Sequence, residues 1–171
     1  MSLPESFVTP RLRAVRLTHE HLGEIRRMHL DPVVMASLGG VRTEAQTVAY
    51  HERNLRHWDQ YGFGVWILHE RDGSEIIGRT LLRHLAVDGV DEVEVGYAFY
   101  APYWARGLAT EATGVCLAMG RERLGLPSIV AITRPSNLAS QRVLVKSGLI
   151  YERDMAHEGT VHALFRTAFT A

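Results

Sequence analysis

Residues 94–112 read Glu94-Val-Gly-Tyr-Ala-Phe-Tyr-Ala-Pro-Tyr-Trp-Ala-Arg-Gly-Leu-Ala-Thr-Glu-Ala112. An apolar, strand-like run ends here in a short turn, and the turn opens directly into a helix through Arg106-Gly107-Leu108-Ala109. The first N–H groups of a helix have no partner within the helix, so such a junction favours binding of a phosphate. Arg106 adds a positive charge with a planar fork of donors. The segment therefore predicts a phosphate-bearing ligand at residues 105–110, and the alternative is a turn with a purely structural role.

The composition is that of one globular domain. The chain has 171 residues, of which 46% are hydrophobic, and we expect a single domain over residues 1–171. Basic and acidic residues number 19 each, so the net charge is zero, whereas a nucleic-acid-binding protein normally shows a basic surplus. The apolar runs are too short to span a bilayer, and residues 1–10 lack the features of a signal peptide. We therefore expect a soluble, cytoplasmic protein without nucleic-acid or membrane partners.

Metal binding and thiol chemistry are not predicted. The single cysteine, Cys116, excludes an intrachain disulfide and a cysteine-rich metal site. It lies near the apolar stripe of a predicted helix, which favours a small core residue over a nucleophile. None of the nine histidines shows the spacing of metal ligands: His51-Glu52 lacks a second His one turn later, and His19 and His21 diverge on a helix. We therefore expect no metal.

Turn and capping residues divide the chain into helices and strands. Helices are expected from an N-cap at Thr18 to Leu30, where Asp31-Pro32 ends the helix, and over residues 44–59, 107–123 and 138–147. Strands are expected over residues 11–17, 65–70, 75–85, 92–100, 129–133, 149–155 and 161–169. Hairpins come first and a βαβ unit later, so the sequence predicts an α+β domain on one mixed sheet. The strands 92–100 and 129–133 should be parallel neighbours.

The strand before the turn carries a candidate base. Glu92 and Glu94 are two residues apart, so both side chains point to one face of the strand, which Gly96 and Ala98 continue. The small side chains leave room for a ligand along the strand, with Glu94 at the entrance as a candidate general base. The alternative is a solvated strand face.

The helix over residues 138–147 carries a second set of candidates. Asn137, Ser140 and Leu144 fall on one stripe at helical spacing. An amide and a hydroxyl that face the predicted phosphate turn could hold a ligand or protonate it. The alternatives are that Asn137 caps the helix and that Ser140 packs against the sheet.

Two segments together resemble a known family. Residues 94–112 resemble the acetyl-CoA motif of the GNAT N-acetyltransferase superfamily, and Asn137-Leu-Ala-Ser-Gln-Arg-Val-Leu-Val-Lys-Ser-Gly148 resembles the motif that follows it. The opening residues 9–16, Asp31-Pro32 and Ile77-Gly78 are similar to the ribosomal-protein N-acetyltransferase (RimJ/RimL-like) branch. The resemblance covers residues 7–171.

The resemblance implies a fold and a co-substrate. The fold is a single GNAT-like domain with a central mixed, mostly antiparallel sheet, splayed parallel fourth and fifth strands, and helices on both faces. The co-substrate is acetyl-CoA, whose pantetheine arm lies in the gap between the splayed strands. By this resemblance, pantetheine pairs with the strand at Tyr97, Ala98, Phe99 and Tyr100 and contacts Asn137, while the pyrophosphate lies on Arg106, Gly107, Leu108, Ala109 and Thr110.

Two departures from the family pattern bear on the implied reaction. Trp104 stands where the family loop often begins with Gln or Arg, and Leu144 stands where a Tyr is the frequent general acid. Ser140, one turn before Leu144, is then the candidate to protonate the leaving thiolate, a role assigned to a serine in the RimJ/RimL-like branch. Because leucine cannot donate a proton, the alternative is a catalytically silent acetyl-CoA-binding module.

The implied activity is that of an acetyl-CoA-dependent N-acetyltransferase. The acceptor is a primary amine, on a peptide or protein N-terminus or on a small molecule, that attacks the acetyl group directly. Glu94 would take the amine proton, and a backbone N–H near residues 97–99 would hold the oxyanion. Four acidic residues are compatible with a cationic acceptor, although surface solvation explains them equally well: Asp88, Asp91, Glu92 and Glu94. Dimers are common among relatives, so the resemblance also allows a homodimer.

Overall fold

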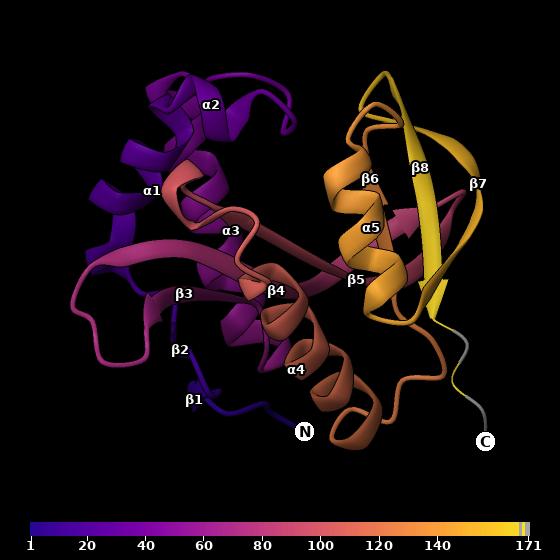
Figure 1. Ribbon diagram of the computed structural model, residues 1–171, viewed down its shortest axis with the longest axis horizontal. Coiled ribbons are helices and arrows are strands. Elements are labelled where there is room, and N and C mark those ends of the chain that lie inside the picture. The colour runs from indigo at the N-terminus through magenta and orange to yellow at the C-terminus, as the bar shows by residue number, and fades with distance from the viewer. Residues whose placement is uncertain (168, 170–171) are drawn as a thin grey trace.

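The computed structural model describes residues 1–167 and 169 of the chain (Figure 1). The strands of these residues form one sheet in the order β1-β2-β3-β4-β5-β6-β8-β7. The strands are β1 (Ser6–Val8), β2 (Leu12–Arg16), β3 (Val65–Glu70), β4 (Ile76–Val87), β5 (Val90–Phe99), β6 (Val130–Thr133), β7 (Leu149–His157) and β8 (Thr160–Thr167). The α-helices are α1 (Leu22–Leu30), α2 (Pro32–Met35), α3 (Glu44–Tyr61), α4 (Leu108–Glu122) and α5 (Leu138–Lys146), with 3₁₀ turns at His19–His21 and Ala101–Tyr103. Among the helices described, none is both long and apolar enough to cross a membrane.

The predicted α+β class and the βαβ unit are confirmed. β5 and β6 are parallel and α4 connects them, whereas the other neighbouring strands are antiparallel. The short edge strand β1 was not predicted from the sequence, so the strands expected as fourth and fifth are β5 and β6. The strand predicted over residues 161–169 ends at Thr167, and residue 168 lies outside the described residues.

The turn at Asp31-Pro32 has two functions. As predicted, α1 ends just before it. The Asp31 carboxylate also accepts hydrogen bonds from the backbone N–H groups of Val33 (2.9 Å) and Val34 (3.2 Å), so it caps the short helix α2 that follows. Pro32 is suited to the first position of that helix because the N–H it lacks has no helical partner there. A helix break in the sequence therefore also marks a helix start.

The sheet opens between β5 and β6. These two strands share a single register pair, Glu94 with Val130, although β5 continues to Phe99 and β6 to Thr133. Two parallel strands that stayed in contact would pair along this whole length. The strands therefore diverge beyond Glu94, which leaves one edge of the last part of β5 without a neighbouring strand in the described part of the chain. Figure 1 shows α1–α3 and β1–β3 on one side of this opening, and α5, β6, β8 and β7 on the other. The end of β4 packs with the second group through Leu85 and Val87.

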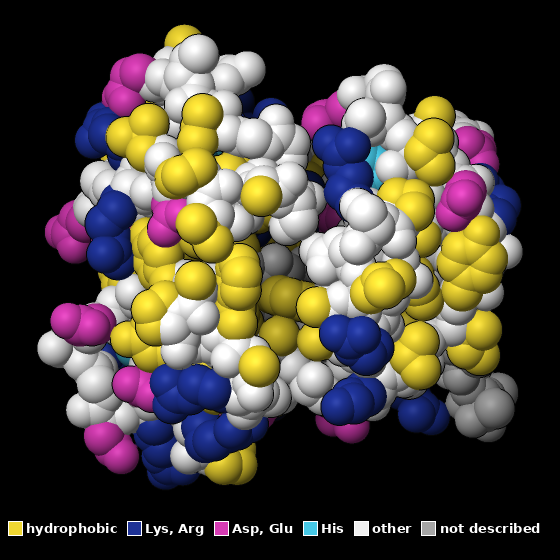
Figure 2. All heavy atoms as spheres, turned by 45° about the horizontal axis from the view of Figure 1, so that its top comes forward, with side chains coloured by type: hydrophobic (Ala, Val, Ile, Leu, Met, Phe, Trp, Pro, Cys, Tyr) yellow, Lys and Arg dark blue, Asp and Glu magenta, His cyan; other side chains and the backbone are white. Residues whose placement is uncertain are grey.

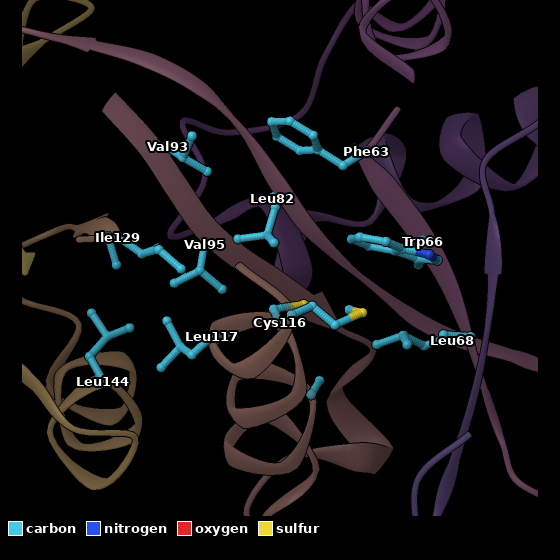
Figure 3. Packing of buried hydrophobic residues seen from close by; sticks show 14 of the residues in the cluster. Phe63, Trp66, Leu68, Leu82, Val93, Val95, Cys116, Leu117, Ile129 and Leu144 are labelled. Atoms are coloured by element: carbon cyan, nitrogen blue, oxygen red, sulfur yellow. The ribbon is translucent and has the colours of Figure 1, made fainter. Parts of the chain in front are cut away.

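Each face of the sheet has its own hydrophobic core. Figure 3 shows the larger one, in which Val93 and Val95 of β5 lie with Cys116 and Leu117 of α4 and with Leu144 of α5. On the opposite face, the sheet packs against α1 and α3 through a cluster formed by Leu17, Ile25, Tyr50, Leu55, Val65, Ile67 and Leu81. The predicted arrangement of helices on both faces is thus confirmed. Successive residues of β5 serve opposite faces.

Candidate functional site

The turn between β5 and α4 has the backbone geometry expected of an anion site. Gly107 is the N-cap of α4 and has φ 77°, and Ala105 has φ 56°. The helical hydrogen bonds of α4 begin with Glu111, whose N–H donates to the Gly107 carbonyl (3.1 Å). The N–H groups of Leu108, Ala109 and Thr110 therefore precede the first helical bond, as the sequence predicted. They can serve a ligand at the start of α4.

Arg106 has a protein partner next to this turn. Its guanidinium lies 2.7 Å from Glu70 and stacks 5.4 Å from the ring centre of Tyr103. The side chain was predicted as a source of positive charge for the phosphate. In the structure that charge is shared with a carboxylate, so the backbone N–H groups are the freer donors.

Arg11 fixes the shape of the turn, and sequence reasoning missed this role. Its Nη1 donates to the carbonyl oxygen of Arg106 (2.6 Å), and its Nε donates to Glu111 of α4 (2.7 Å). Thr9 donates to the same carboxylate. Although burial acts to raise it, these hydrogen bonds hold the pKa of Glu111 below its usual value. The only signal in the sequence was the similarity of residues 9–16 to a family branch, which assigned no role to Arg11.

Tyr97 and Ser140 face each other across the opening of the sheet. The Tyr97 hydroxyl on β5 donates to the Ser140 hydroxyl on α5, with 3.1 Å between the oxygens. Burial raises the pKa of Tyr97, so this hydroxyl stays protonated at neutral pH. Asn137 caps α5 by accepting from the Ser140 N–H (3.1 Å), as the structural alternative proposed. The structure thus brings together three residues predicted for the site, whereas Leu144 lies in the core at 3% exposure.

The side chains at the end of β5 are engaged within the protein. Ala98 packs against α1 and α2, and Phe99 lies in the core. The Tyr100 hydroxyl donates to Glu24 (2.8 Å), and burial and that carboxylate raise the pKa of Tyr100 far above its usual value. The indole N–H of Trp104 donates to the Phe99 carbonyl (2.7 Å). Only backbone groups of this segment are therefore left for a ligand, as the resemblance implies, and two of these are already bonded: the Phe99 carbonyl has a donor, and the Tyr100 N–H donates to the Ile77 carbonyl (3.0 Å).

Glu94 is neither on a solvated strand face nor at an open entrance. It is 4% exposed and lies opposite Arg83 in the β4–β5 register. The Arg83 Nε donates to Glu94 Oε1. Although burial acts to lower it, the carboxylate keeps the pKa of Arg83 above its usual value. The sequence pattern placed Glu94 on the correct face but did not reveal this ion pair.

The other acidic residues near Glu94 are paired as well. Asp88 pairs with Arg153, Asp91 lies 2.9 Å from His84, and Glu92 lies 2.8 Å from Arg166. A set of free carboxylates would favour a cationic acceptor, but each of these has a partner. The acidic residues therefore give no support to a cationic acceptor.

Cys116 is a core residue, as predicted. Its side chain is fully buried and packs with the residues shown in Figure 3. Burial raises the pKa of the thiol to about 12. A thiol that stays protonated is a poor nucleophile, so Cys116 contributes packing and no chemistry.

Figure 2 shows a hollow between the half of the molecule that carries α1–α3 and the half that carries α5 and β6–β8. It follows the opening between β5 and β6, where the register ends. The free edge of β5, the start of α4 and the Tyr97–Ser140 pair all belong to this part of the molecule. An elongated ligand with a phosphate at one end fits this arrangement of groups.

Comparisons with known proteins agree with this geometry. The Acetyltransferase (GNAT) domain family matches residues 11–150. The uncharacterized protein YkkB of Bacillus subtilis is 30% identical over 123 residues, which cover 72% of each protein. The FsC-acetyl coenzyme A-N(2)-transacetylase of Aspergillus fumigatus is 27% identical over 84% of this chain, and the match spans 64% of the fungal protein's length.

Solved structures show the same fold. A GNAT-family acetyltransferase from Bordetella pertussis superposes with a TM-score of 0.83 at 24% identity, over 96% of this chain and 100% of that one. RimL, a ribosomal L7/L12 α-N-protein acetyltransferase solved with coenzyme A, gives 0.76 at 15% identity, over 95% of this chain and 96% of that one. The family match covers most of the chain, and the fold and the site geometry agree with it. The chain belongs to the GNAT acetyltransferase family and is an acetyl-CoA-dependent acyltransferase.

Proposed function

We propose that this protein is an N-acetyltransferase of the RimJ/RimL-like branch that acetylates a primary amine, on a peptide N-terminus or a small molecule. Residues 1–171 act as one domain in this proposal. The observation that carries it is the continuity of the free edge of β5 with the open start of α4. One extended ligand can meet strand hydrogen-bonding groups along its arm and helix N–H groups at its phosphates.

Because the free edge of β5 leads into the open start of α4, we assign the residues that bind acetyl-CoA to these two segments. Within residues 97–100, the backbone groups that neither β4 nor Trp104 occupies pair with the pantetheine arm. The N–H groups of residues 106–110 hold the pyrophosphate. Gly107 supports this assignment, because a Cβ there would meet Arg11 Nη2 at 3.2 Å and disturb the contact that fixes the turn. Asn137 uses its carbonyl oxygen as the helix cap, so its NH₂ group is the part that serves pantetheine.

Ser140 is the proposed proton donor to the departing thiolate. The Tyr97 hydroxyl donates to Ser140 Oγ, so the proton of Ser140 itself can point elsewhere. A hydroxyl that accepts one hydrogen bond becomes a better donor in the next. Leu144 on α5 cannot donate a proton to the thiolate. Tyr97 on β5 instead makes Ser140 a better proton donor through their hydrogen bond.

Glu94 is the proposed base. An ammonium cannot attack a thioester, so the amine must first lose a proton. Arg83 contacts Oε1 of Glu94, which makes Oε2 the atom to receive that proton, directly or through a water. The backbone N–H groups near residues 97–99 then hold the oxyanion that forms when the amine attacks.

Two measurements test this function. Acetyl-CoA at 100 times its dissociation constant should stabilise the protein by about 2.7 kcal/mol, which raises the melting temperature by several degrees. Release of the CoA thiol is then followed with a panel of amines. Binding without thiol release from any amine would contradict the proposed acetyl transfer to amines.

A further inference from the structure

Three arginines surround one tyrosine on the face of the sheet that α1–α3 cover. The guanidinium carbons of Arg42, Arg79 and Arg53 lie 5.1, 5.4 and 5.7 Å from the ring centre of Tyr50. Arg42 precedes α3, Arg53 and Tyr50 belong to α3, and Arg79 belongs to β4. We call these three arginines the Tyr50 cluster.

The positive charge of the Tyr50 cluster is not balanced by nearby carboxylates. Within the described residues, none of its arginines has an ion pair or a side-chain hydrogen bond. Glu94 is occupied by Arg83. Glu158 acts electrostatically on Arg42, but its side chain is 84% exposed to solvent. An arginine without a counter-charge is costly to hold at a protected site, so its retention points to an anion that is supplied from outside.

Arg79 makes this argument strongest because it is almost fully buried. The residue is 6% exposed, and its Nε is enclosed without a hydrogen-bond partner among the residues that the structure describes. The hydroxyl of Tyr50 and the Nε2 of His29 are likewise enclosed and unpartnered. Buried polar groups normally have partners, so several unpartnered polar groups around one ring favour a ligand site at this place. Of the other two arginines, Arg42 is half-buried and Arg53 is exposed.

The local electrostatics agree with this interpretation. His29 is completely buried, and burial, followed by the charges of Arg42 and Arg79, lowers its pKa to about 3. Burial, Arg79 and Arg83 also lower the pKa of Arg42. A neighbourhood that disfavours further positive charge favours a negative one.

The Tyr50 cluster lies beside the proposed reaction site. In the β4–β5 register Arg79 is opposite Ala98, and Arg83 is opposite Glu94. Arg79 and Arg83 share a face of β4, the face next to the proposed base. A ligand on this face can therefore contact Arg79 with one end while its amine approaches Glu94.

We propose that the acceptor is an amine that also carries an oxyanion, a carboxylate or a phosphate, and that Arg79 and Arg42 bind this oxyanion. The inference rests on the proposed function, because it names the acceptor class of the same site. A guanidinium presents two parallel N–H donors that match both kinds of oxyanion, and the Tyr50 hydroxyl adds a third donor.

Matched pairs of acceptors test the inference. Glycine, β-alanine, 4-aminobutyrate and 6-aminohexanoate are compared with their neutral amides, and phosphoethanolamine is compared with ethanolamine. We expect kcat/KM to be at least tenfold higher for the anionic member of the preferred pair. Comparing the amino acids with phosphoethanolamine then shows whether the oxyanion of the acceptor is a carboxylate or a phosphate. Equal or better turnover of the neutral members would overturn the inference and leave the proposed function intact.

Variants of the Tyr50 cluster separate binding from folding. Arg79→Gln should raise KM for the anionic acceptor at least tenfold without the same rise in KM for acetyl-CoA, so that most of the selectivity for the anionic member over its neutral amide is lost. Arg42→Gln, on a different element, should act in the same direction, and Arg79→Lys should restore part of the selectivity. The matched control is Arg123→Gln, an exposed arginine at the end of α4, which should behave as wild type. Wild-type selectivity in both Arg79→Gln and Arg42→Gln would overturn the inference.

A binding measurement covers the case in which the proposed function fails. If no amine releases CoA thiol, titration calorimetry with the same anionic compounds and with inorganic phosphate still tests the Tyr50 cluster. Binding by the wild type that Arg79→Gln loses supports an anion site. No binding of any of these anions by the wild type would overturn it. Because Arg79→Gln removes an unpaired buried charge, its melting temperature should be no lower than that of the wild type.

Discussion

Glu94 combines a chemical role and a structural one, and a single substitution separates them. Glu94→Gln keeps the shape but removes the charge, so the rate should fall on the order of 10²-fold or more if Glu94 is the base. The substitution also leaves Arg83 without its partner, which should cost about 3 kcal/mol of stability. Steady-state rates across pH, together with urea unfolding, measure both effects.

A second substitution controls for the lost ion pair. Arg83→Met in the Glu94→Gln background removes the orphaned guanidinium and should recover stability without recovering activity. A pH–rate profile of Glu94→Gln that matches the wild type would show that Glu94 is not the base. Recovery of activity with stability would assign Glu94 a structural role.

The Tyr97–Ser140 hydrogen bond predicts coupled kinetic effects. Tyr97→Phe removes the donor to Ser140, and Ser140→Ala removes the proposed acid itself. Each should lower kcat with little change in KM for acetyl-CoA, and the double variant should be no slower than Ser140→Ala, because the two residues act as a unit. A double-mutant cycle on kcat measures the coupling. Near-normal turnover of Ser140→Ala would show that Ser140 is not the acid and has only a packing role.

At the scale of residues, the sequence predicted site residues that lie close together along the chain but not contacts between distant segments. Asn137 and Ser140 were found because helical spacing relates residues three apart. The partners Tyr97 and Ser140 are 43 residues apart, and Arg83 meets Glu94 only through the register of a hairpin. The Tyr50 cluster draws on residues of three segments. Local patterns contain no information on such contacts, so these partners could not be predicted from them.

At the scale of elements, the turn before α4 should be sensitive to the residue at Gly107. Its φ of 77° costs a non-glycine residue about 1 kcal/mol, and a Cβ would meet Arg11 Nη2 at 3.2 Å. Gly107→Ala should therefore lose about 1 kcal/mol of stability and also weaken acetyl-CoA binding. Thermal unfolding with and without acetyl-CoA measures the two quantities.

Gly89→Ala is the matched control for this prediction. Gly89 has φ 80° at the β4–β5 turn, and a Cβ there would meet nothing within 4 Å. This variant should show a similar loss of stability with unchanged acetyl-CoA affinity. Equal affinities in both variants would mean that the turn before α4 does not depend on its contact with Arg11.

Element boundaries were predicted where a side chain enforces them. The Thr43–Gln46 capping box sets the start of α3, and Gly148 with φ 89° follows α5, both as expected from the sequence. β1 was missed because a three-residue edge strand has too few residues to show alternation. The Thr9–Arg11–Glu111 contacts that tie this edge to α4 were missed with it.

At the scale of the whole molecule, the strand β5 borders the opening in the sheet and contributes side chains to both faces of the sheet. β5 gives Val93, Val95 and Phe99 to the core under α4, and Glu94 and Ala98 to the face under α1–α3. The order of hairpins and a βαβ unit was enough to predict this sheet. Where β5 and β6 diverge was implied only by the family resemblance, because nothing in a local pattern ends a parallel ladder after one pair.

The same packing makes the molecule sensitive to acid through its histidines. Burial is the first cause that lowers the pKa of six of them: His21, His29, His51, His57, His69 and His162. A histidine with a lowered pKa stays neutral in the folded state while the unfolded chain takes up a proton below about pH 6.5. The unfolded state then binds more protons, so stability falls as the pH drops below about 6.5, and for His29 it continues to fall towards pH 3.

His29 isolates the largest single contribution. It is fully buried, and its folded pKa of about 3 means that it does not protonate between pH 7 and pH 5. The wild type should therefore lose about 2 kcal/mol from this residue over that interval. His29→Asn retains a group that can bond to Thr47 and does not titrate, so its unfolding free energy should fall by about 2 kcal/mol less between the two pH values. Urea unfolding at pH 7 and pH 5 measures the difference, and parallel losses in both proteins would show that His29 is already protonated in the folded state.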